Sequence, residues 1–380
     1  MNSLRDIVES SPHAHSTEPE PAIFLHAGEE PQPLGPPRWN WEAVKRVLVI
    51  RLRSIGDTVL ATPSLFALKR FLPDVQVDIL VEDWVAPLLM DHPHVDNVIE
   101  LKRGGMSARM AAARALRAAR YDVVYNLHGG TTATFLTRAT GARHRVGFKT
   151  YQYAKLHTVL APSPLLLWGQ QKTHSVEQQL ALLGWTGVPV SDRPRTRLGI
   201  APEAAGSVIE RLAAAGLGDR KIALIHPAAA FATKRWATKN FARVAEYLAE
   251  RGYAPVAIAA RHEAEIIDEL VNEASVPILA LDLSLPEVSA LASRAQIFVG
   301  NDSGIAHIAA AVGTPAVVIF GSSNIAHWRP WNHAAAAEVV VEEMPCQPCH
   351  GYFCEKFPQP ECILRVPVAR VQNAIERLLR

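Results

Sequence analysis

The sequence predicts an α/β protein made of two Rossmann-like domains whose parallel sheets face each other across a cleft. Short apolar runs typical of buried strands alternate with helical stretches of about 10–15 residues, which is the pattern of a doubly wound sheet. The alternation loosens in "GVPVSDRPRTRLGIAP" near the middle of the chain and then starts again. The 380 residues are also enough for two domains with sizeable cores.

The first half begins with a buried strand at Val47 to Ile50, a polar turn, and a helix from about Thr58 to Phe71. Strands "VQVDILVE" and "VDNVIEL" follow, then an alanine- and arginine-rich helix from Met106 to Arg120 and the strand "DVVYNLHGG". The arginines of that helix are typical of a solvated amphipathic face.

The second half continues with strand "KIALIHPAA", helix "NFARVAEYLAERG", strand "PVAIAA", helix "EAEIIDELVNE", strand "PILAL" and helix "LPEVSALASRA". A strand from Gln296 to Val299, a helix from Gly304 to Val312 and a strand from Ala316 to Phe320 come next. Asp302 and Ser303 are good N-cap residues for that helix. A final helix is expected in "PVARVQNAIERLLR".

Four segments follow from this pattern. We expect a mobile N-terminal extension at residues 1–40, a first Rossmann-like domain at 41–190, a second at 191–365, and a C-terminal helix at 366–380. The extension is rich in Pro, Glu and His and poor in aliphatic residues, which favours disorder.

Charge and hydropathy restrict the class of protein. The chain carries 39 Lys and Arg against 37 Asp and Glu, a net charge of +2, which argues against non-specific nucleic-acid binding. Residues 1–40 have two basic and six acidic side chains, whereas residues 41–150 have sixteen and ten, which indicates an anionic partner for the first domain. No signal peptide and no apolar run of about 18 residues is visible, so we expect a soluble cytoplasmic protein.

Three polar turns are the candidate functional segments. In "RLRSIGDTVL", Asp57 is either a helix N-cap or a general base that faces the cleft. In "HPAAAFATKRWATKNF", Lys234 adds positive charge and Trp236 either anchors the loop or stacks on a base. In "GNDSGIAH", a helix N-terminus follows a strand and is suited to a phosphate, with His307 on the same helix face as Ser303. No G-x-G-x-x-G or Walker A motif is present.

All four cysteines fall in one segment, "CQPCHGYFCEKFPQPEC". They are Cys346, Cys349, Cys354 and Cys362. Four thiolates suit tetrahedral zinc or iron, while reduced structural thiols are the alternative. A metal there would brace the loop before the last helix and take no part in catalysis.

Three ordered segments together resemble glycosyltransferase family 9, the ADP-heptose:lipopolysaccharide heptosyltransferases. They are "VLVIRLRSIGDTVLATPSLFALK", "HPAAAFATKRWATKNFARVAEYL" and "VGNDSGIAHIAAAVGTPAVVIFGSS", and "VVYNLHGGTTATFLTRATGARHRVGF" is similar to the family's intermediate segment. The resemblance runs from about Val44 to the C-terminus.

The resemblance implies a GT-B fold and an inverting transfer of heptose from ADP-heptose that needs no cofactor. It implies that the first domain binds the acceptor and supplies Asp57 as base, and that the second binds the nucleotide sugar. The donor residues that it implies are Lys234, Glu263, Asp302, Ser303, Gly304 and His307. Arg51 and Arg53, beside Asp57, are the residues placed to touch an anionic acceptor. Ser303 replaces the family's usual threonine, and Ala228 stands where many relatives have glycine.

We therefore expect a heptosyltransferase that acts on the lipopolysaccharide inner core at the inner membrane surface, either free in the cytoplasm or peripheral to that membrane. Two alternatives stay open: a heptosyltransferase that modifies an autotransporter protein, which the cysteine segment suggests, and a GT-B protein that binds nucleotide sugar without turnover. The missing glycine fingerprint disfavours a nicotinamide dehydrogenase.

Overall fold

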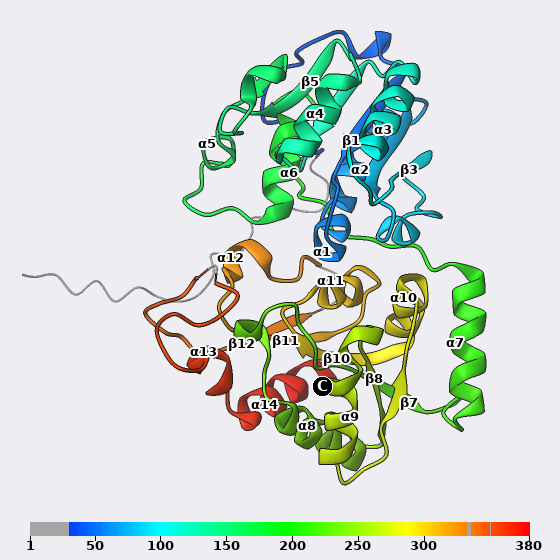
Figure 1. The fold of residues 1–380 in the computed structure, drawn as a ribbon, viewed down its shortest axis with the longest axis vertical. Helices are drawn as coiled ribbons and strands as arrows, with labels where there is room; N and C mark the ends of the chain where they lie inside the picture. Colours follow the sequence, from blue (N-terminus) through cyan, green and yellow to red (C-terminus); the bar gives the residue numbers. More distant parts are fainter. Residues whose placement is uncertain (1–29, 333–335, 350) are drawn as a thin grey trace, which may run out of the picture.

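The computed structural model describes residues 30–332, 336–349 and 351–380. They form two bodies, one above the other in Figure 1, each built on a six-stranded sheet whose neighbouring strands are all parallel. Helices cover the sheets, so the predicted α/β class with two parallel sheets is confirmed. The predicted domain boundaries stay a prediction.

The N-terminal sheet has the strand order β3-β2-β1-β4-β5-β6. Its strands are β1 (Arg46–Ile50), β2 (Gln76–Glu82), β3 (Asn97–Leu101), β4 (Val123–Asn126), β5 (His144–Phe148) and β6 (Val159–Ala161). Its helices are η1 (Trp41–Ala43), α1 (Ile55–Val59), α2 (Thr62–Phe71), η2 (Ala86–Leu88), α3 (Met106–Ala118), α4 (Thr131–Ala139), η3 (Ala154–Leu156), α5 (Pro164–Trp168) and α6 (Ser175–Gly184).

The C-terminal sheet has the order β12-β11-β10-β7-β8-β9, which is the same winding repeated. Its strands are β7 (Lys221–His226), β8 (Tyr253–Ile258), β9 (Leu279–Leu281), β10 (Ala295–Asn301), β11 (Ala316–Phe320) and β12 (Ala337–Val341). Its helices are α7 (Pro202–Ala214), η4 (Ala232–Lys234), α8 (Thr238–Glu250), η5 (Arg261–Glu263), α9 (Ala264–Glu273), α10 (Leu285–Arg294), α11 (Gly304–Ala311), α12 (Ile325–Trp328), α13 (Glu361–Leu364) and α14 (Val368–Leu379).

The helix expected from Thr58 to Phe71 is two helices, α1 and α2. Pro63 causes the break, because it has no N–H to donate to the carbonyl of Val59 four residues earlier. The hydroxyl of Thr62 donates to that carbonyl instead, at 2.8 Å. The chain therefore turns between α1 and α2, and α1 forms a separate short helix directly after the first strand.

Residues 30–40 differ from the expected mobile extension, since they pack on the first body. The backbone N–H of Leu34 donates to the carbonyl of Gly184 at 3.0 Å, and the guanidinium of Arg38 lies 3.6 Å from the ring centroid of Trp185. Aromatic packing and backbone pairing thus hold this segment, which its composition did not predict. Residues 1–29, the rest of that prediction, lie outside the described residues.

The two bodies meet where α1 contacts α11. A Cβ atom added to Gly304 would lie 2.6 Å from the Cβ of Ile55, and one added to Gly56 would lie 2.7 Å from Cδ2 of His307. Both distances are shorter than real Cβ contacts, so the two glycines allow these helices to approach each other. Within the described part of the chain, every helix is too short or too polar to span a bilayer.

We expect Gly304→Ala to destabilise the protein by about 1–3 kcal/mol, because the new methyl group would push against the backbone-proximal atoms of Ile55. Gly206→Ala is the matched control: Gly206 lies inside α7, and an added Cβ would meet no atom within 4 Å. There the change should stabilise the helix by up to about 1 kcal/mol. Thermal unfolding midpoints compare the two variants, and equal stability of Gly304→Ala and wild type would contradict the close contact.

Candidate active site

The candidate site residues follow the four central strands between which the strand order of each sheet changes direction. In each sheet the chain order turns round between two central strands, β1 and β4 in the first and β7 and β10 in the second. Open α/β sheets bind ligands at the carboxyl ends of such strands. Asp57 follows β1, His128 follows β4, Lys234 follows β7 and Asp302 follows β10.

Asp57 is the third residue of α1, and Ser54 is the N-cap, so the interpretation of Asp57 as the N-cap is wrong. Its Oδ2 accepts hydrogen bonds from the backbone N–H of Ser54 at 3.1 Å and from the Ser54 hydroxyl at 3.3 Å. Its Oδ1 pairs with the guanidinium of Arg51. These contacts fix the carboxylate at the start of the helix, beside the contact between the two bodies.

Arg51 and Arg53 have different surroundings. Arg51 is buried, and besides Asp57 it donates to the carbonyl of Leu127 at 2.6 Å. Arg53 is exposed. Burial is the main cause that lowers the pKa of His128, and the positive charges of Arg51 and Arg53 lower it further. Arg51 therefore orients Asp57, while Arg53 has no ion-pair partner in the described part of the chain. The predicted contact of Arg53 with the acceptor stays a prediction.

Lys234 forms an ion pair with Asp302, in which Nζ lies 2.8 Å from Oδ2. The hydroxyl of Ser323 donates to the same carboxylate oxygen at 2.5 Å. The pair joins the loop after β7 to the loop after β10 and brings Lys234 and Asp302 of the predicted donor set together. An ammonium has three N–H donors, so pairing with Asp302 leaves others for a phosphate oxygen.

Trp236 anchors the loop that carries Lys234. Its side chain is 2 % exposed, and its indole N–H donates to the carbonyl of Val366 at 2.9 Å. Its backbone N–H donates at 3.1 Å to the side chain of Asn301, which in turn donates to the carbonyl of Pro227 at 2.7 Å. Of the two interpretations of Trp236, burial supports the anchor and excludes stacking on a base.

The N-terminus of α11 carries unpaired polar atoms. Ser303 is its N-cap, yet its hydroxyl is buried and has no hydrogen-bond partner among the described residues. The same holds for Nδ1 of His307, whose side chain is 5 % exposed. Together with the free backbone N–H groups of the first turn, which begins at Gly304, these atoms suit an anionic ligand.

Burial lowers the pKa of His307 below its ordinary value, while the nearby carboxylates of Asp302 and Asp57 oppose that shift and Lys234 adds to it. The imidazole is therefore neutral at neutral pH, and one of its nitrogens remains available to a ligand. Asp302 and Lys234 belong to the second body and Asp57 to the first. Asp57 therefore lies close enough to the second body for its charge to act on His307.

Glu263 lies apart from this group. Its Oε2 accepts from the backbone N–H of Ala260 at 3.2 Å and closes the turn after β8. Among the described residues it forms no hydrogen bond or ion pair with Lys234 or Asp302. Burial lowers the pKa of His226, and the negative charge of Glu263 opposes that shift only in part. Its predicted role at the ribose stays a prediction.

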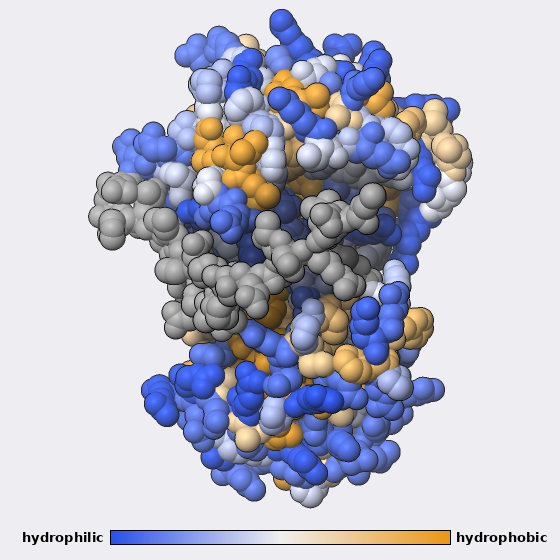
Figure 2. Space-filling view, turned by 90° about the vertical axis from the view of Figure 1, so that its left-hand side faces the viewer, coloured by the Kyte–Doolittle hydropathy of each residue, from blue (hydrophilic) through white to orange (hydrophobic). Residues whose placement is uncertain are grey.

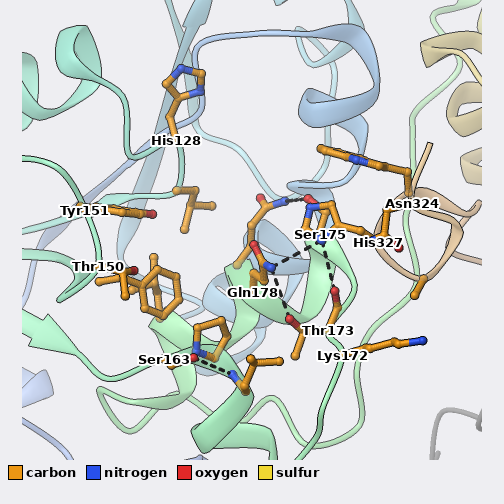
Figure 3. Close-up of a pocket in the computed structure, with 18 of the residues that line it drawn as sticks. His128, Thr150, Tyr151, Ser163, Lys172, Thr173, Ser175, Gln178, Asn324 and His327 are labelled. Atoms are coloured by element: carbon orange, nitrogen blue, oxygen red, sulfur yellow. Dashed lines mark hydrogen bonds between the residues drawn. The ribbon is translucent and has the colours of Figure 1, made fainter. Parts of the chain in front are cut away.

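A cavity of about 600 Å³ lies between the bodies, mainly on the side of the first (Figure 3). Arg51 is the one residue of the predicted site that lines it. Polar side chains from both bodies surround it, with His128, Tyr151, Lys172, Gln178, Asn324 and His327 among them. His327, on α12 of the second body, shares a hydrogen bond between Nδ1 and the carbonyl of Thr173 on the first, at 3.2 Å.

Apart from Arg51, these lining residues were not predicted from the sequence. A signal existed for His128, Asn324 and His327, since each follows a strand of a parallel sheet within a few residues, at its carboxyl end. Lys172 and Gln178 gave no such signal, because they lie in the segment before α6 and within that helix.

The four cysteines line a second cavity, of about 390 Å³, together with Thr233 and Ser322. Burial raises the pKa of Cys362 to about 11, and the three neighbouring thiols add to the shift. In the described residues, however, no three His, Cys, Asp or Glu side chains are close enough to form a metal site.

The cysteine segment supports the loop of Lys234. The Ser322 hydroxyl donates to the Thr233 hydroxyl at 2.9 Å, and that of Thr233 donates to the carbonyl of Gly351 at 3.1 Å. The backbone N–H of Cys349 donates to the carbonyl of Ser322 at 2.9 Å. The segment thus lies directly behind the candidate donor site.

Comparison with known proteins places these features in a family. Residues 109–357 match the model of glycosyltransferase family 9 (heptosyltransferase). Lipopolysaccharide heptosyltransferase 3 of Escherichia coli is 30% identical over 347 residues, which cover 86% of this chain and 97% of the relative.

Solved structures show the same fold. The structure of E. coli ADP-heptose lps heptosyltransferase II has a TM-score of 0.73 at 21% identity, covering 88% of this chain and 98% of the other. E. coli heptosyltransferase WaaC, solved with ADP-2-deoxy-2-fluoro heptose, has a TM-score of 0.65 at 20% identity, covering 87% and 99%. The predicted GT-B architecture is thereby confirmed.

Acid should destabilise this protein before its carboxylates titrate. The pKa of each of five buried histidines is lowered, chiefly by burial: His92, His157, His174, His226 and His307. The unfolded chain binds protons at these positions near pH 6.5, whereas the folded chain does not. We therefore expect the unfolding midpoint to be level from pH 8 to 7 and to fall from about pH 6.5 to 5.5.

The unfolding midpoint of the His307→Gln variant should fall less steeply with decreasing pH than that of wild type, because one buried imidazole is removed. His262→Gln, at an exposed position, serves as the control and should follow wild type. Thermal unfolding at half-unit pH steps measures both variants. A wild-type midpoint that does not change from pH 7 to 5.5 would contradict the prediction.

Proposed function

This chain belongs to glycosyltransferase family 9 and is a glycosyltransferase, and on that premise we propose that it transfers heptose from ADP-heptose to the lipopolysaccharide inner core. The observation that carries the proposal is the meeting of Asp57 from the first body with Lys234, Asp302 and His307 from the second. The names of the relatives supply the sugar and the class of acceptor.

The proposed reaction is an inverting displacement. An acceptor hydroxyl oxygen attacks the anomeric carbon of heptose and forms the new C–O bond. The bond from that carbon to the phosphate oxygen breaks, and ADP leaves with the electron pair. Asp57 takes the proton of the hydroxyl, as general base.

Charge develops on the leaving phosphate, and residues of the second body would stabilise it. Lys234 and the N-terminus of α11 are fixed before the donor arrives, by the Asp302 pair and the Trp236 anchor. Such preorganised groups stabilise a transition state with little reorganisation. No cofactor takes part in this scheme.

The acceptor would enter the 600 Å³ cavity beside Arg51. Its polar and cationic lining, with Lys172 among the residues, suits a phosphorylated sugar. We place the reaction at the cytoplasmic surface of the inner membrane, where such an acceptor is anchored. An autotransporter protein acceptor and a binding protein without turnover remain the alternatives, and assays of turnover on each acceptor separate them.

The base and the donor lysine can be tested separately. Asp57→Asn keeps an oxygen that can accept from Ser54, so the fold and ADP affinity should persist while kcat falls at least about 100-fold. Calorimetry with ADP and turnover with ADP-heptose measure the two effects. An Asp57→Asn enzyme with full turnover would remove the proposed base.

Lys234→Ala should weaken ADP binding about 10–100-fold, because a charged hydrogen bond to phosphate is lost. Lys239→Ala is its control: Lys239 is an exposed lysine at the start of α8 and should bind ADP like wild type. Calorimetry measures both. If the two variants bind ADP equally well, Lys234 does not contact the donor.

We also propose that the four cysteines hold one structural zinc or iron ion. Their common cavity supports this. Binding would have to draw the thiols closer together, because in this structure no three of the described His, Cys, Asp or Glu side chains are close enough to hold a metal. The ion would stabilise the segment behind Thr233 and Ser322 and take no part in the transfer.

Metal analysis of the purified protein should find about one zinc or iron per chain, because four thiolates form a complete tetrahedral site. The double variant Cys349→Ser/Cys354→Ser should lose the metal and unfold at a lower temperature. A metal-free wild type with four reduced thiols would instead support purely structural cysteines.

A further inference from the structure

One stretch of the first body contains no carboxylate. Residues 123–176 include no Asp and no Glu, although the whole chain has 37 of them. The same stretch carries six cations: Arg138, Arg143, Arg145, Lys149, Lys155 and Lys172. Among the described residues, none of the six forms an ion pair. Within the part of the chain that the structure describes, no carboxylate is therefore paired with these positive charges.

The same stretch exposes apolar side chains. Of the thirteen large hydrophobic residues exposed on the described surface, five lie between residues 135 and 166. Leu166 is 76 % exposed, and the other four are about 40 % exposed: Phe135, Tyr153, Leu156 and Leu165. A cluster of this size in a short stretch differs from the scattered single residues usual on soluble proteins.

These residues lie together at the β6 edge of the first sheet. Phe135 is on α4, which contacts η3, and η3 carries Leu156 directly after Lys155. Strand β6 follows η3, and α5 with Leu165 and Leu166 follows β6. Figure 1 shows α5 on the outer left of the upper body, and Figure 2 looks at that side, where apolar residues gather in the upper body. We name this surface the β6-edge face.

The β6-edge face borders the cavity of the candidate acceptor site. Thr150, Tyr151, Ser163, Leu165 and Lys172 line that cavity, and all five belong to the stretch without carboxylates. A molecule held on this face would therefore lie at the entrance of the cavity.

We propose that the β6-edge face binds the surface of an anionic lipid bilayer, with the leucines of α5 and η3 entering the headgroup region. This inference rests on the proposed function, because a lipid-anchored acceptor has to be presented by a membrane. Lysines and arginines that form no ion pair with another described residue, together with exposed leucines, match anionic headgroups above an apolar layer. The position of the cavity lets the sugar of such a lipid reach Arg51 while its anchor stays in the bilayer.

The charge of the face argues against a second copy of this chain as the partner. A two-fold dimer interface brings the same patch of both subunits together. Cations from a stretch without carboxylates would then face identical cations of the other copy, and like charges repel. An anionic surface avoids this conflict.

Vesicle sedimentation tests the proposal with the full-length wild-type chain. Vesicles of phosphatidylglycerol mixed with phosphatidylcholine should bind it, and pure phosphatidylcholine should bind it at least about tenfold more weakly, with binding reduced by salt. Leu166→Asp/Leu156→Asp should lower the partition coefficient at least about tenfold, because both side chains would enter the bilayer. Neither residue lines the cavity.

Ile209→Asp/Val271→Asp is the matched control. These residues are exposed hydrophobics, 47 % and 40 %, on α7 and α9 of the second body, and their replacement should leave vesicle binding unchanged. Equal binding by the leucine variant and wild type, or no binding of wild type to anionic vesicles, would overturn the proposal. So would a wild-type dimer in solution that the leucine variant dissociates.

Turnover separates this inference from the proposed function. With a water-soluble, delipidated acceptor, the leucine variant should transfer heptose like wild type, while on acceptor in anionic vesicles it should be slower by at least about tenfold. If wild type transfers to neither acceptor but binds vesicles, the proposed acceptor is wrong and the membrane face stands. If wild type transfers heptose to both acceptors, and Leu166→Asp/Leu156→Asp is as fast as wild type on the acceptor in vesicles, the proposed membrane-binding face is wrong.

Discussion

The close approach of α1 and α11 is the constraint on which the candidate active site depends. Gly56 lies against His307 and Gly304 lies against Ile55, and a methyl group at either glycine would separate the helices. Each helix begins directly after a strand at the reversal point of its sheet, β1 or β10. The contact therefore brings the polar turns of two sheets into one site. Without it, the carboxylate of Asp57 and the unpaired atoms of the α11 N-terminus would belong to separate surfaces.

A layer of buried contacts behind the site holds its charged groups in place. Asn301, the last residue of β10, holds the loop after β7 at Pro227 and Trp236, and Trp236 fixes that loop to the segment before α14. Ser322 and Thr233 extend this support to the cysteine segment. Arg51 has the corresponding role in the first body, where it joins Asp57 to the loop after β4. A site supported in this way needs little movement of its own groups when charge develops on a ligand.

The two bodies differ in how their positive charges are arranged. In the second body, the positive charge of Lys234 is paired with the negative charge of Asp302, and this ion pair holds the ammonium group in one position. In the first body, the stretch from residue 123 to 176 has cations without carboxylates, and five of its six cations are exposed. The first arrangement suits a small anion in a defined position, and the second suits an extended anionic surface. The cavity beside Arg51 is lined by residues of that stretch and by Asn324 and His327 of the second body.

The two α/β units, most strands, and the loops that carry Asp57, Lys234, Asp302 and His307 can be predicted from the amino-acid sequence. Those features depend on local alternation of apolar residues and on turn residues at strand ends, which are written within short windows. Tertiary structure alone decided that Ser54 caps α1, that Arg51 pairs with Asp57, and that residues 30–40 pack on the first body. It also decided the cavity, where His327 meets Thr173 across 154 positions of the chain. Such contacts form only when the two bodies pack against each other. The pattern of apolar residues within a short window does not predict which residues far apart in the chain will meet.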